Sequence, residues 1–261
     1  MSARFPETPG RLLSHRTVLR LPLVLLHVAL GLPLTLICFL PGLRLIPAGH
    51  GMRLNQRAQR SWMRVFLWAC GARLAVRGHL PPGPGLIVAN HISWLDIVVL
   101  HAVWPMHLVG KAEIRRWPLV GGLAALAGTI FIERGRTESR RRVNRRLTAL
   151  MRRGDRVGIF PEAGIQAERG VGRFHPRLFA SAIRAPAPVV PVAIRYHDGR
   201  DLHDEIVFAP GQNLLVNFAR LLARRSYRVE VMIGPGLIHQ GVSRDQLAAE
   251  ARQIVKDYYE S

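Results

Sequence analysis

The chain has 261 residues, of which 49% are hydrophobic, so it can bury a core and is not globally disordered. Lys and Arg number 37 against 17 Asp and Glu, which gives a formal net charge of +20. Nucleic acid, an anionic bilayer and phosphorylated small molecules all suit such a surface. The two cysteines, Cys38 and Cys70, are too few for a disulfide framework and lack metal-ligand spacing, which indicates a reducing compartment.

Near the N-terminus lies an almost uncharged run, Leu21 to Leu40, close to the ~20 residues that a helix needs to cross a bilayer. Arginines stand on both sides of it, which favours a segment that enters and leaves on the cytoplasmic face of a membrane. No small-residue cleavage site follows, so the run is not a clean signal peptide. Four residues disfavour a straight span: Pro22, His27, Gly31 and Pro33. A kinked or re-entrant helix and a full crossing therefore both stay open.

Residues 55–74 carry apolar side chains at helical spacing with arginines interleaved. This pattern is typical of a helix in the lipid interface, although a helix packed on the domain would show it too. We expect residues 1–75 to form a basic leader with membrane-anchoring helices, and residues 76–261 to form an α/β domain. A nucleic-acid-binding protein would not need the apolar run. That class therefore stays as an alternative that only the positive charge supports.

The stretch Asn90 to Asp96 joins a predicted strand, residues 86–89, to an apolar helical segment. His91 stands at the strand end, and Asp96 falls in the first helical turn if Ser93 is the N-cap. This spacing lets the carboxylate fold back onto the imidazole and leave its other nitrogen free as a general base. Ser93 and Asp96 are equally typical of an ordinary capped helix start.

Alternating strands and helices continue downstream and predict an α/β fold, with a mixed, largely parallel sheet flanked by helices behind the N-terminal helical anchor. The further expected strands lie within residues 128–134, 156–159, 188–194 and 229–233, and the further helices within 137–153, 213–225 and 243–259. The last helix begins with a Ser243 to Gln246 capping box. The helix within 137–153 has arginines on its outer face, which can hold anionic headgroups or simply be solvated.

Two strand ends carry candidate binding groups. Arg134 follows a short strand, at the edge where open α/β sheets bind ligands. The sequence Phe160-Pro161-Glu162-Ala163-Gly164 makes a tight loop whose backbone N–H groups can receive a phosphate. The histidines after His91 share no spacing with a carboxylate or thiol cluster, so we expect neither a metal nor a cofactor.

Read together, the ordered blocks resemble the family of 1-acyl-sn-glycerol-3-phosphate acyltransferases, also called lysophosphatidic acid or lysophospholipid acyltransferases. The blocks are Asn90-His91-x-Ser93-Trp94-x-Asp96, Gly128-x-Ile130-Phe131-Ile132-x-Arg134, Phe160-Pro161-Glu162 and Val190-Pro191-Val192-Ala193-Ile194, with Lys111-x-Glu113 and Pro118-x-x-Gly121 between them. The resemblance covers residues 86–194. No Gly-x-Ser-x-Gly elbow is present, which argues against a serine acyl-enzyme.

The resemblance implies a membrane enzyme of lipid biosynthesis that moves a fatty acyl group from acyl-CoA or acyl-ACP to the free hydroxyl of a lysolipid. His91 and Asp96 would be catalytic. The substrate-binding residues would be Ser93, Lys111, Arg134, Phe160, Pro161, Glu162 and Gly164. The expected partners are the lysolipid, the acyl donor and anionic membrane lipids, not nucleic acid, and the expected location is the cell inner membrane with the catalytic domain on its cytoplasmic face.

One block departs from the family. Where relatives usually read Phe-Pro-Glu-Gly-Thr-Arg-Ser, this chain has Phe160-Pro161-Glu162-Ala163-Gly164-Ile165-Gln166, so the usual arginine has no aligned counterpart. We expect 1-acyl-sn-glycerol-3-phosphate as the acceptor, with another lysolipid such as lyso-ornithine lipid as the alternative. A relative that binds lipid without catalysis is a further alternative.

Overall fold

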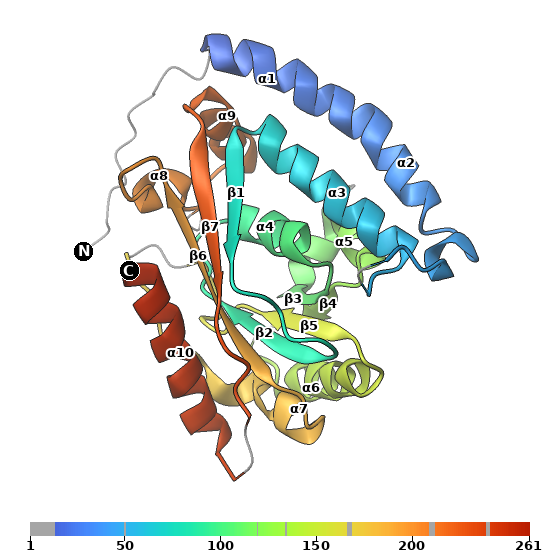
Figure 1. The fold of residues 1–261 in the computed structure, drawn as a ribbon, viewed down its shortest axis with the longest axis vertical. Coiled ribbons are helices and arrows are strands. Elements are labelled where there is room, and N and C mark those ends of the chain that lie inside the picture. Colours follow the sequence, from blue (N-terminus) through green and yellow to red (C-terminus); the bar gives the residue numbers. More distant parts are fainter. Residues whose placement is uncertain are drawn as a thin grey trace. The chain divides into compact units, whose positions relative to one another are not determined.

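The structure is a computed structural model, and it describes residues 14–49, 51–118, 120–133, 135–165, 169–208, 212–238 and 241–261. Seven strands form one sheet in the order β1-β7-β6-β2-β5-β3-β4 (Figure 1). They are β1 (Ala72–Arg77), β2 (Gly85–Ala89), β3 (His107–Lys111), β4 (Ile130–Ile132), β5 (Arg156–Ile159), β6 (Val189–His197) and β7 (Tyr227–Ile233). Strand β2 pairs in parallel with β5 and β6, and β3 pairs in parallel with β4 and β5. The chain after β7 bridges to β6 in the antiparallel sense, Val189 to Leu237. The expected mixed, largely parallel sheet flanked by helices is confirmed.

The chain divides into two compact units, each assembled from separate stretches. Unit 1 comprises Met1–Ala75, Ile92–Pro105 and Arg195–Glu230. Unit 2 comprises Val76–His91, Met106–Ile194 and Val231–Ser261. A division falls at residue 75, where the sequence suggested a domain boundary, but unit 1 also takes in two later stretches of the chain.

The core of unit 2 lies between its strands and three helices. Helices α6 (Thr137–Arg152), α7 (Ala180–Arg184) and α10 (Arg244–Glu260) pack apolar side chains against β2, β5 and β6. Helix α6 buries Val143, Leu147, Leu150 and Met151, while its arginines stay on the outer face, as its sequence periodicity predicted. The predicted capping box of α10 is present, with the Ser243 hydroxyl accepting from the Gln246 N–H. Shorter elements of this unit are η3 (Ala112–Arg116), α5 (Val120–Leu126) and η4 (Pro176–Leu178).

Unit 1 begins with a long apolar helix. It runs from His15 to Ile37 as α1 (His15–Leu26), a π-helical turn η1 (His27–Gly31) and α2 (Leu32–Ile37). By length and composition this helix could cross a membrane, and few of its side chains are buried in the protein. Leu19, Leu30 and Leu34 are 71%, 59% and 65% exposed. The helix continues through Pro22. A π-helical turn at His27–Gly31, in the middle of the apolar run, joins its two α-helical parts.

Helix α3 (Leu54–Ala69) packs against α4 (Leu95–Val103) and also against the first helix. A row of neighbouring rings runs through this unit in the order His27, Trp62, Phe66, Phe218 and Trp94, with ring centroids 5.1 to 6.3 Å apart. The His27 Nε2 also lies 3.0 Å from the Trp62 carbonyl oxygen. Aromatic contacts therefore link the apolar N-terminal helix to Trp94, the residue that precedes α4. The remaining elements are η2 (Leu43–Leu45), α8 (His203–Ile206) and α9 (Leu214–Ala223).

The helix expected over residues 55–74 is shorter than its pattern suggested. It ends at Ala69, and β1 begins at Ala72. Gly71 lies between them with a φ of +83°, a conformation that terminates helices and favours glycine. The apolar residues beyond Gly71 fit a half-buried strand as well as a helix, so periodicity could not distinguish the two.

Candidate active site

The parallel pairing of β2 and β5 brings two loops of unit 2 to the same edge of the sheet. Val88 pairs with Ile159, so the chain leaves both strands in register and reaches His91 on one side and Glu162 on the other, each three residues later. Ligands of open α/β sheets bind outside the carboxyl ends of the strands. The position of His91 is therefore one at which a reactive side chain can meet a substrate.

Phe160 and Glu162 hold His91 in two ways. The imidazole stacks on the Phe160 ring, with centroids 4.0 Å apart and planes inclined by 16°. The His91 backbone N–H donates a hydrogen bond of 2.7 Å to Glu162 Oε2. Both side chains come from the loop after β5, and the imidazole itself remains half-buried. The ring orientation is thus restrained while part of the ring stays open to a reactant.

Glu162 connects the His91 turn to a second loop. Its other oxygen, Oε1, accepts a 2.7 Å hydrogen bond from the Gly172 N–H, and the residue is 6% exposed. Arg252 of α10 secures that loop, because its guanidinium donates to the carbonyls of Val171 and Gly172 at 2.7 Å each. In the described contacts Glu162 therefore binds backbone amides and positions His91. Its expected part in substrate binding stays a prediction.

Asn90, immediately before His91, extends the sheet with its side chain. Its amide nitrogen donates to the Ile194 carbonyl at 2.9 Å, and its amide oxygen accepts from the Ile194 N–H at 2.8 Å. The side chain is fully buried. A primary amide offers one donor and one acceptor as a peptide group does, so Asn90 adds a pair of strand-like hydrogen bonds toward β6.

Asp96 lies in unit 1, in the first turn of α4, and its carboxylate is fully buried. Oδ2 accepts from the backbone N–H groups of Ile92 and Ser93, each at 2.8 Å. Oδ1 accepts from the Tyr196 hydroxyl at 2.6 Å. Burial and the neighbouring Asp96 carboxylate raise the pKa of Tyr196 well above its usual range, so the phenol remains a donor. The carboxylate does fold back over the turn that follows His91.

The start of α4 differs by one residue from the sequence expectation. The N-cap is Trp94, not Ser93, and no side chain caps it. Ser93 is buried and its hydroxyl accepts from the Leu95 N–H at 3.3 Å, so it acts one position earlier, within the turn. The Asp96 carboxylate points back and binds the N–H groups of Ile92 and Ser93, which precede the helix, so it does not cap the helix either.

Three other predicted binding residues, Lys111, Pro161 and Gly164, lie in unit 2 after or at the ends of its strands. Pro161 is buried, and its carbonyl accepts from the His175 N–H at 2.8 Å. Gly164 is half-buried, and Lys111 is exposed at the end of β3. Ala163 adopts a φ of +62° at the position where relatives usually carry glycine. Arg134 lies outside the described residues.

Sequence reasoning missed the groups that support the site. Tyr196 follows the last recognised block, but nothing in its spacing pointed to Asp96, one hundred residues earlier. Asn217 of α9 accepts from Trp94 Nε1 at 2.9 Å, and the sequence pattern of residues 213–225 predicted only a helix there. Two histidines that follow His91 contact other parts of the protein: His101 is 2% exposed and lies 3.1 Å from the Gln59 amide, and His107 lies 3.0 Å from the Gly128 carbonyl. Within the described ranges no cluster of His, Cys, Asp or Glu could hold a metal ion.

Comparison with known proteins places the chain in a family. The Acyltransferase family matches residues 73–195, which contain His91, Asp96, Phe160 and Glu162. A lyso-ornithine lipid O-acyltransferase of Pseudomonas aeruginosa is 38% identical over 241 residues, 92% of each chain. The chain belongs to the lysolipid acyltransferase family, and it is an acyltransferase.

Other relatives carry two different names. A 1-acyl-sn-glycerol-3-phosphate acyltransferase of Neisseria gonorrhoeae is 42% identical over 117 residues, 45% of this chain and 46% of that one. A lyso-ornithine lipid O-acyltransferase of Brucella abortus is 31% identical over 79% of this chain and 83% of its own. The crystal structure of the 1-acyl-sn-glycerophosphate acyltransferase PlsC from Thermotoga maritima shares the fold, with a TM-score of 0.68 at 18% identity over 94% and 96% of the two chains.

Proposed function

We propose that this enzyme transfers a fatty acyl group from a thioester, acyl-CoA or acyl-ACP, to the free hydroxyl of a lysolipid, with His91 as the general base. The observation that carries the proposal is the restraint of a half-buried imidazole by Phe160 and Glu162 at the carboxyl edge of the sheet. A general base needs a fixed ring with one nitrogen open to the substrate. Neither a metal nor a cofactor enters the reaction.

The reaction runs by direct attack. His91 removes the proton of the lysolipid hydroxyl as that oxygen bonds to the thioester carbonyl carbon. The tetrahedral intermediate collapses, the carbon–sulfur bond breaks, and the leaving thiolate takes the proton from the imidazolium. Asp96, whose carboxylate is held by two backbone N–H groups and a phenol, stabilises the positive charge that His91 gains.

We favour lyso-ornithine lipid as the acceptor. The relative matched over 92% of both chains carries that name, whereas the 42% identical relative named for 1-acyl-sn-glycerol-3-phosphate matches over 45% of this chain. The loop after Glu162 also lacks the arginine that phosphate-directed relatives usually carry there. An acceptor without a phosphate at this place has no need of that guanidinium. 1-Acyl-sn-glycerol-3-phosphate is the second candidate, supported by the 42% identity of that relative over 117 residues.

The apolar helix His15–Ile37 supports attachment to a membrane, because its exposed leucines would otherwise face water. We place the enzyme in the cell inner membrane with the site on the cytoplasmic side, where acyl-CoA and acyl-ACP are available. Arginines before and after the helix agree with that orientation.

The test is a substrate panel with purified enzyme in detergent. Lyso-ornithine lipid and 1-acyl-sn-glycerol-3-phosphate are each offered with palmitoyl-CoA and palmitoyl-ACP, and acylated product is measured by mass spectrometry. We expect His91→Ala to lose activity ~10²–10⁴-fold or more at unchanged melting temperature. His101→Ala is the matched control, since His101 is a packed histidine outside the site. Near-normal turnover by the His91 variant would disprove the role of the base, and product from neither acceptor would disprove the assignment.

A further inference from the structure

A large cavity of unit 1 lies at the N-terminal end of α1 and includes none of the candidate site residues. We call it the α1 pocket; its volume is about 960 Å³. It is lined by α1, the turn from α3 to β1, the end of β6 and the start of β7. Five arginines contribute to the lining: Arg16, Arg20, Arg73, Arg225 and Arg228.

Most of this positive charge is unneutralised. Arg16, Arg73, Arg225 and Arg228 have no acidic partner among the residues that the structure describes. The one carboxylate in the lining, Asp198, lies 3.6 Å from the guanidinium groups of Arg200 and Arg224. His197, which also lines the pocket, lies 3.4 Å from Glu230. The pocket therefore favours an anion.

Arg20 gives the pocket a fixed inner wall. Its guanidinium donates to the carbonyls of Leu222 and Arg224, at 3.1 and 2.7 Å, and to the Ser226 hydroxyl at 3.3 Å. The group lies over Gly71, where an added Cβ would come within 2.4 Å of it. Arg20 of α1 is thus held in place by the folded unit. The other four guanidinium groups of the lining lie around this preformed wall.

Apolar side chains line the same pocket, and they favour an anion that carries an apolar part. Leu19, Leu23 and Trp68 contribute to the lining and are 71%, 36% and 64% exposed. A free phosphate or a nucleotide would leave these surfaces in water, whereas a phospholipid would cover them with its acyl chains. Tryptophan is also enriched where membranes meet water.

We propose that the α1 pocket binds an anionic phospholipid, its phosphate among the arginines and its acyl chains along Leu19, Leu23 and Trp68. The proposal rests on the membrane attachment proposed above, but not on the reaction. The arginines lie at one end of a helix long enough to cross a bilayer, where lipid headgroups would lie. The bound lipid would help to attach unit 1 to the membrane and would not be the acyl acceptor.

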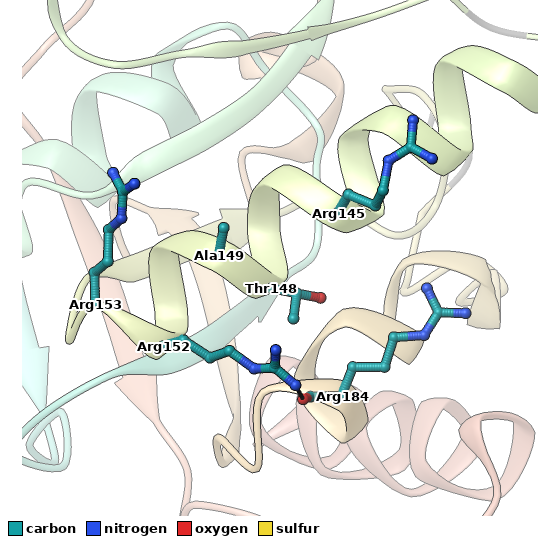
Figure 2. Close-up of a pocket in the computed structure, with 6 residues that line it drawn as sticks. All are labelled: Arg145, Thr148, Ala149, Arg152, Arg153 and Arg184. Carbon is teal, nitrogen blue, oxygen red and sulfur yellow. Dashed lines mark hydrogen bonds between the residues drawn. The ribbon is translucent and has the colours of Figure 1, made fainter.

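A second arginine-lined pocket, in unit 2, provides a matched control. It has a volume of about 590 Å³ and is lined by Arg145, Arg152, Arg153 and Arg184 with Thr148 and Ala149. Figure 2 shows the four guanidinium groups spread along α6 and α7, and Arg152 donates to the Arg184 carbonyl at 2.7 Å. This arginine groove has a comparable charge but no large apolar side chain. Diffuse attraction would act on both pockets equally.

The experiment counts bound lipids by native mass spectrometry on the full chain in neutral detergent. The probes are dioleoyl phosphatidylglycerol and, as a zwitterionic lipid with the same chains, dioleoyl phosphatidylcholine. The pocket variant is Arg16→Gln, Arg225→Gln, Arg228→Gln, and the control is Arg145→Gln, Arg153→Gln, Arg184→Gln. We expect the pocket variant to lose affinity for phosphatidylglycerol roughly 100-fold, while the control loses less than about threefold.

Three results would overturn the proposal: equal losses in both triple variants, phosphatidylcholine binding as tightly as phosphatidylglycerol, or displacement of the lipid by millimolar inorganic phosphate. The melting temperature checks that the pocket variant is folded. His91→Ala must keep full phosphatidylglycerol binding, because His91 does not line the pocket. Failure of the acyl-transfer proposal and failure of this one are therefore read from different measurements.

Discussion

The Tyr196 hydroxyl donates a 2.6 Å hydrogen bond to Oδ1 of Asp96, the aspartate of the motif that begins the candidate site. Together with two backbone N–H groups on Oδ2, this bond holds a fully buried carboxylate. A buried charge is tolerated when its oxygens are hydrogen-bonded. Tyr196 thereby helps to hold the Asp96 carboxylate in place next to the turn that carries His91.

Tyr196→Phe should lower the stability of the protein, whereas Tyr227→Phe should not. Both side chains are buried, with ring centroids 6.4 Å apart, but the Tyr227 hydroxyl has no hydrogen-bond partner in the described structure. Loss of the Tyr196 hydroxyl removes a hydrogen bond to a buried carboxylate and should lower the free energy of unfolding by about 1–3 kcal/mol. Loss of the Tyr227 hydroxyl should leave it unchanged or raise it. Chemical denaturation in detergent measures both, and equal losses would contradict the assigned bond.

Glu162→Gln should weaken the loop that carries the base. Both carboxylate oxygens accept from backbone N–H groups, those of His91 and Gly172. An amide can accept on one side only and would present its NH₂ group to the other N–H. We expect a loss of about 1–3 kcal/mol in stability and a lower kcat. Glu250→Gln, at an exposed carboxylate in α10, is the control and should change neither quantity.

Ala163→Gly should stabilise the protein, against the usual effect of introducing glycine. Ala163 has a φ of +62°, where a Cβ costs about 1 kcal/mol. Glycine removes that cost, although its greater freedom in the unfolded chain offsets part of the gain. The melting temperature should rise or stay level, and the matched Ala149→Gly in α6 should lower it. A fall at position 163 as large as that at 149 would show that the left-handed conformation is wrong.

Stability should decline in alkali. Burial raises the pKa of the Cys70 thiol from 9.0 to about 12, against an opposing effect of Arg20. Burial also raises the pKa values of Tyr196 and Tyr227. The folded state then keeps protons that the unfolded state releases, so the stabilisation is complete below pH 9 and falls as the pH rises toward 12. Each group contributes a slope of up to about 1.4 kcal/mol per pH unit.

Cys70→Ala removes one of these slopes. The decline of the unfolding free energy between pH 9 and 10 should become shallower in this variant and keep its wild-type steepness in Cys38→Ala. A slope that is the same in all three proteins would show that the Cys70 thiol does not titrate in this window.

The sequence predicted the parts of the fold whose patterns are local. The apolar runs before His91 and before Phe160 are strands, and the capping box at Ser243 begins a helix. Residues 72–77 were not recognised as a strand. The mixture of apolar residues and arginines that forms the preceding helix continues into them, and only Gly71 marks the boundary. Strand β3 was missed because it has only five residues and both its first residue, His107, and its last, Lys111, are polar.

The candidate site was predictable where the motif is contiguous and not where it depends on distant chain segments. His91 and Phe160 were recognised from their blocks, and the parallel register of β2 and β5 explains why the blocks meet. The partners Tyr196 and Arg252 are joined to the site by folding alone, and a single tyrosine or arginine carries no sign of its contact. The pairing of the His91 ring with the Asp96 carboxylate stays a prediction.

Asn90 has a consequence for how freely this enzyme can vary. Its side chain must donate to one backbone atom of Ile194 and accept from another while fully enclosed. Aspartate lacks the donor, leucine lacks both groups, and glutamine is one methylene too long for the enclosure. In a saturation library selected for acyl transfer, codon 90 should therefore converge on asparagine as strictly as codon 91 on histidine, although the Asn90 side chain is fully enclosed by protein.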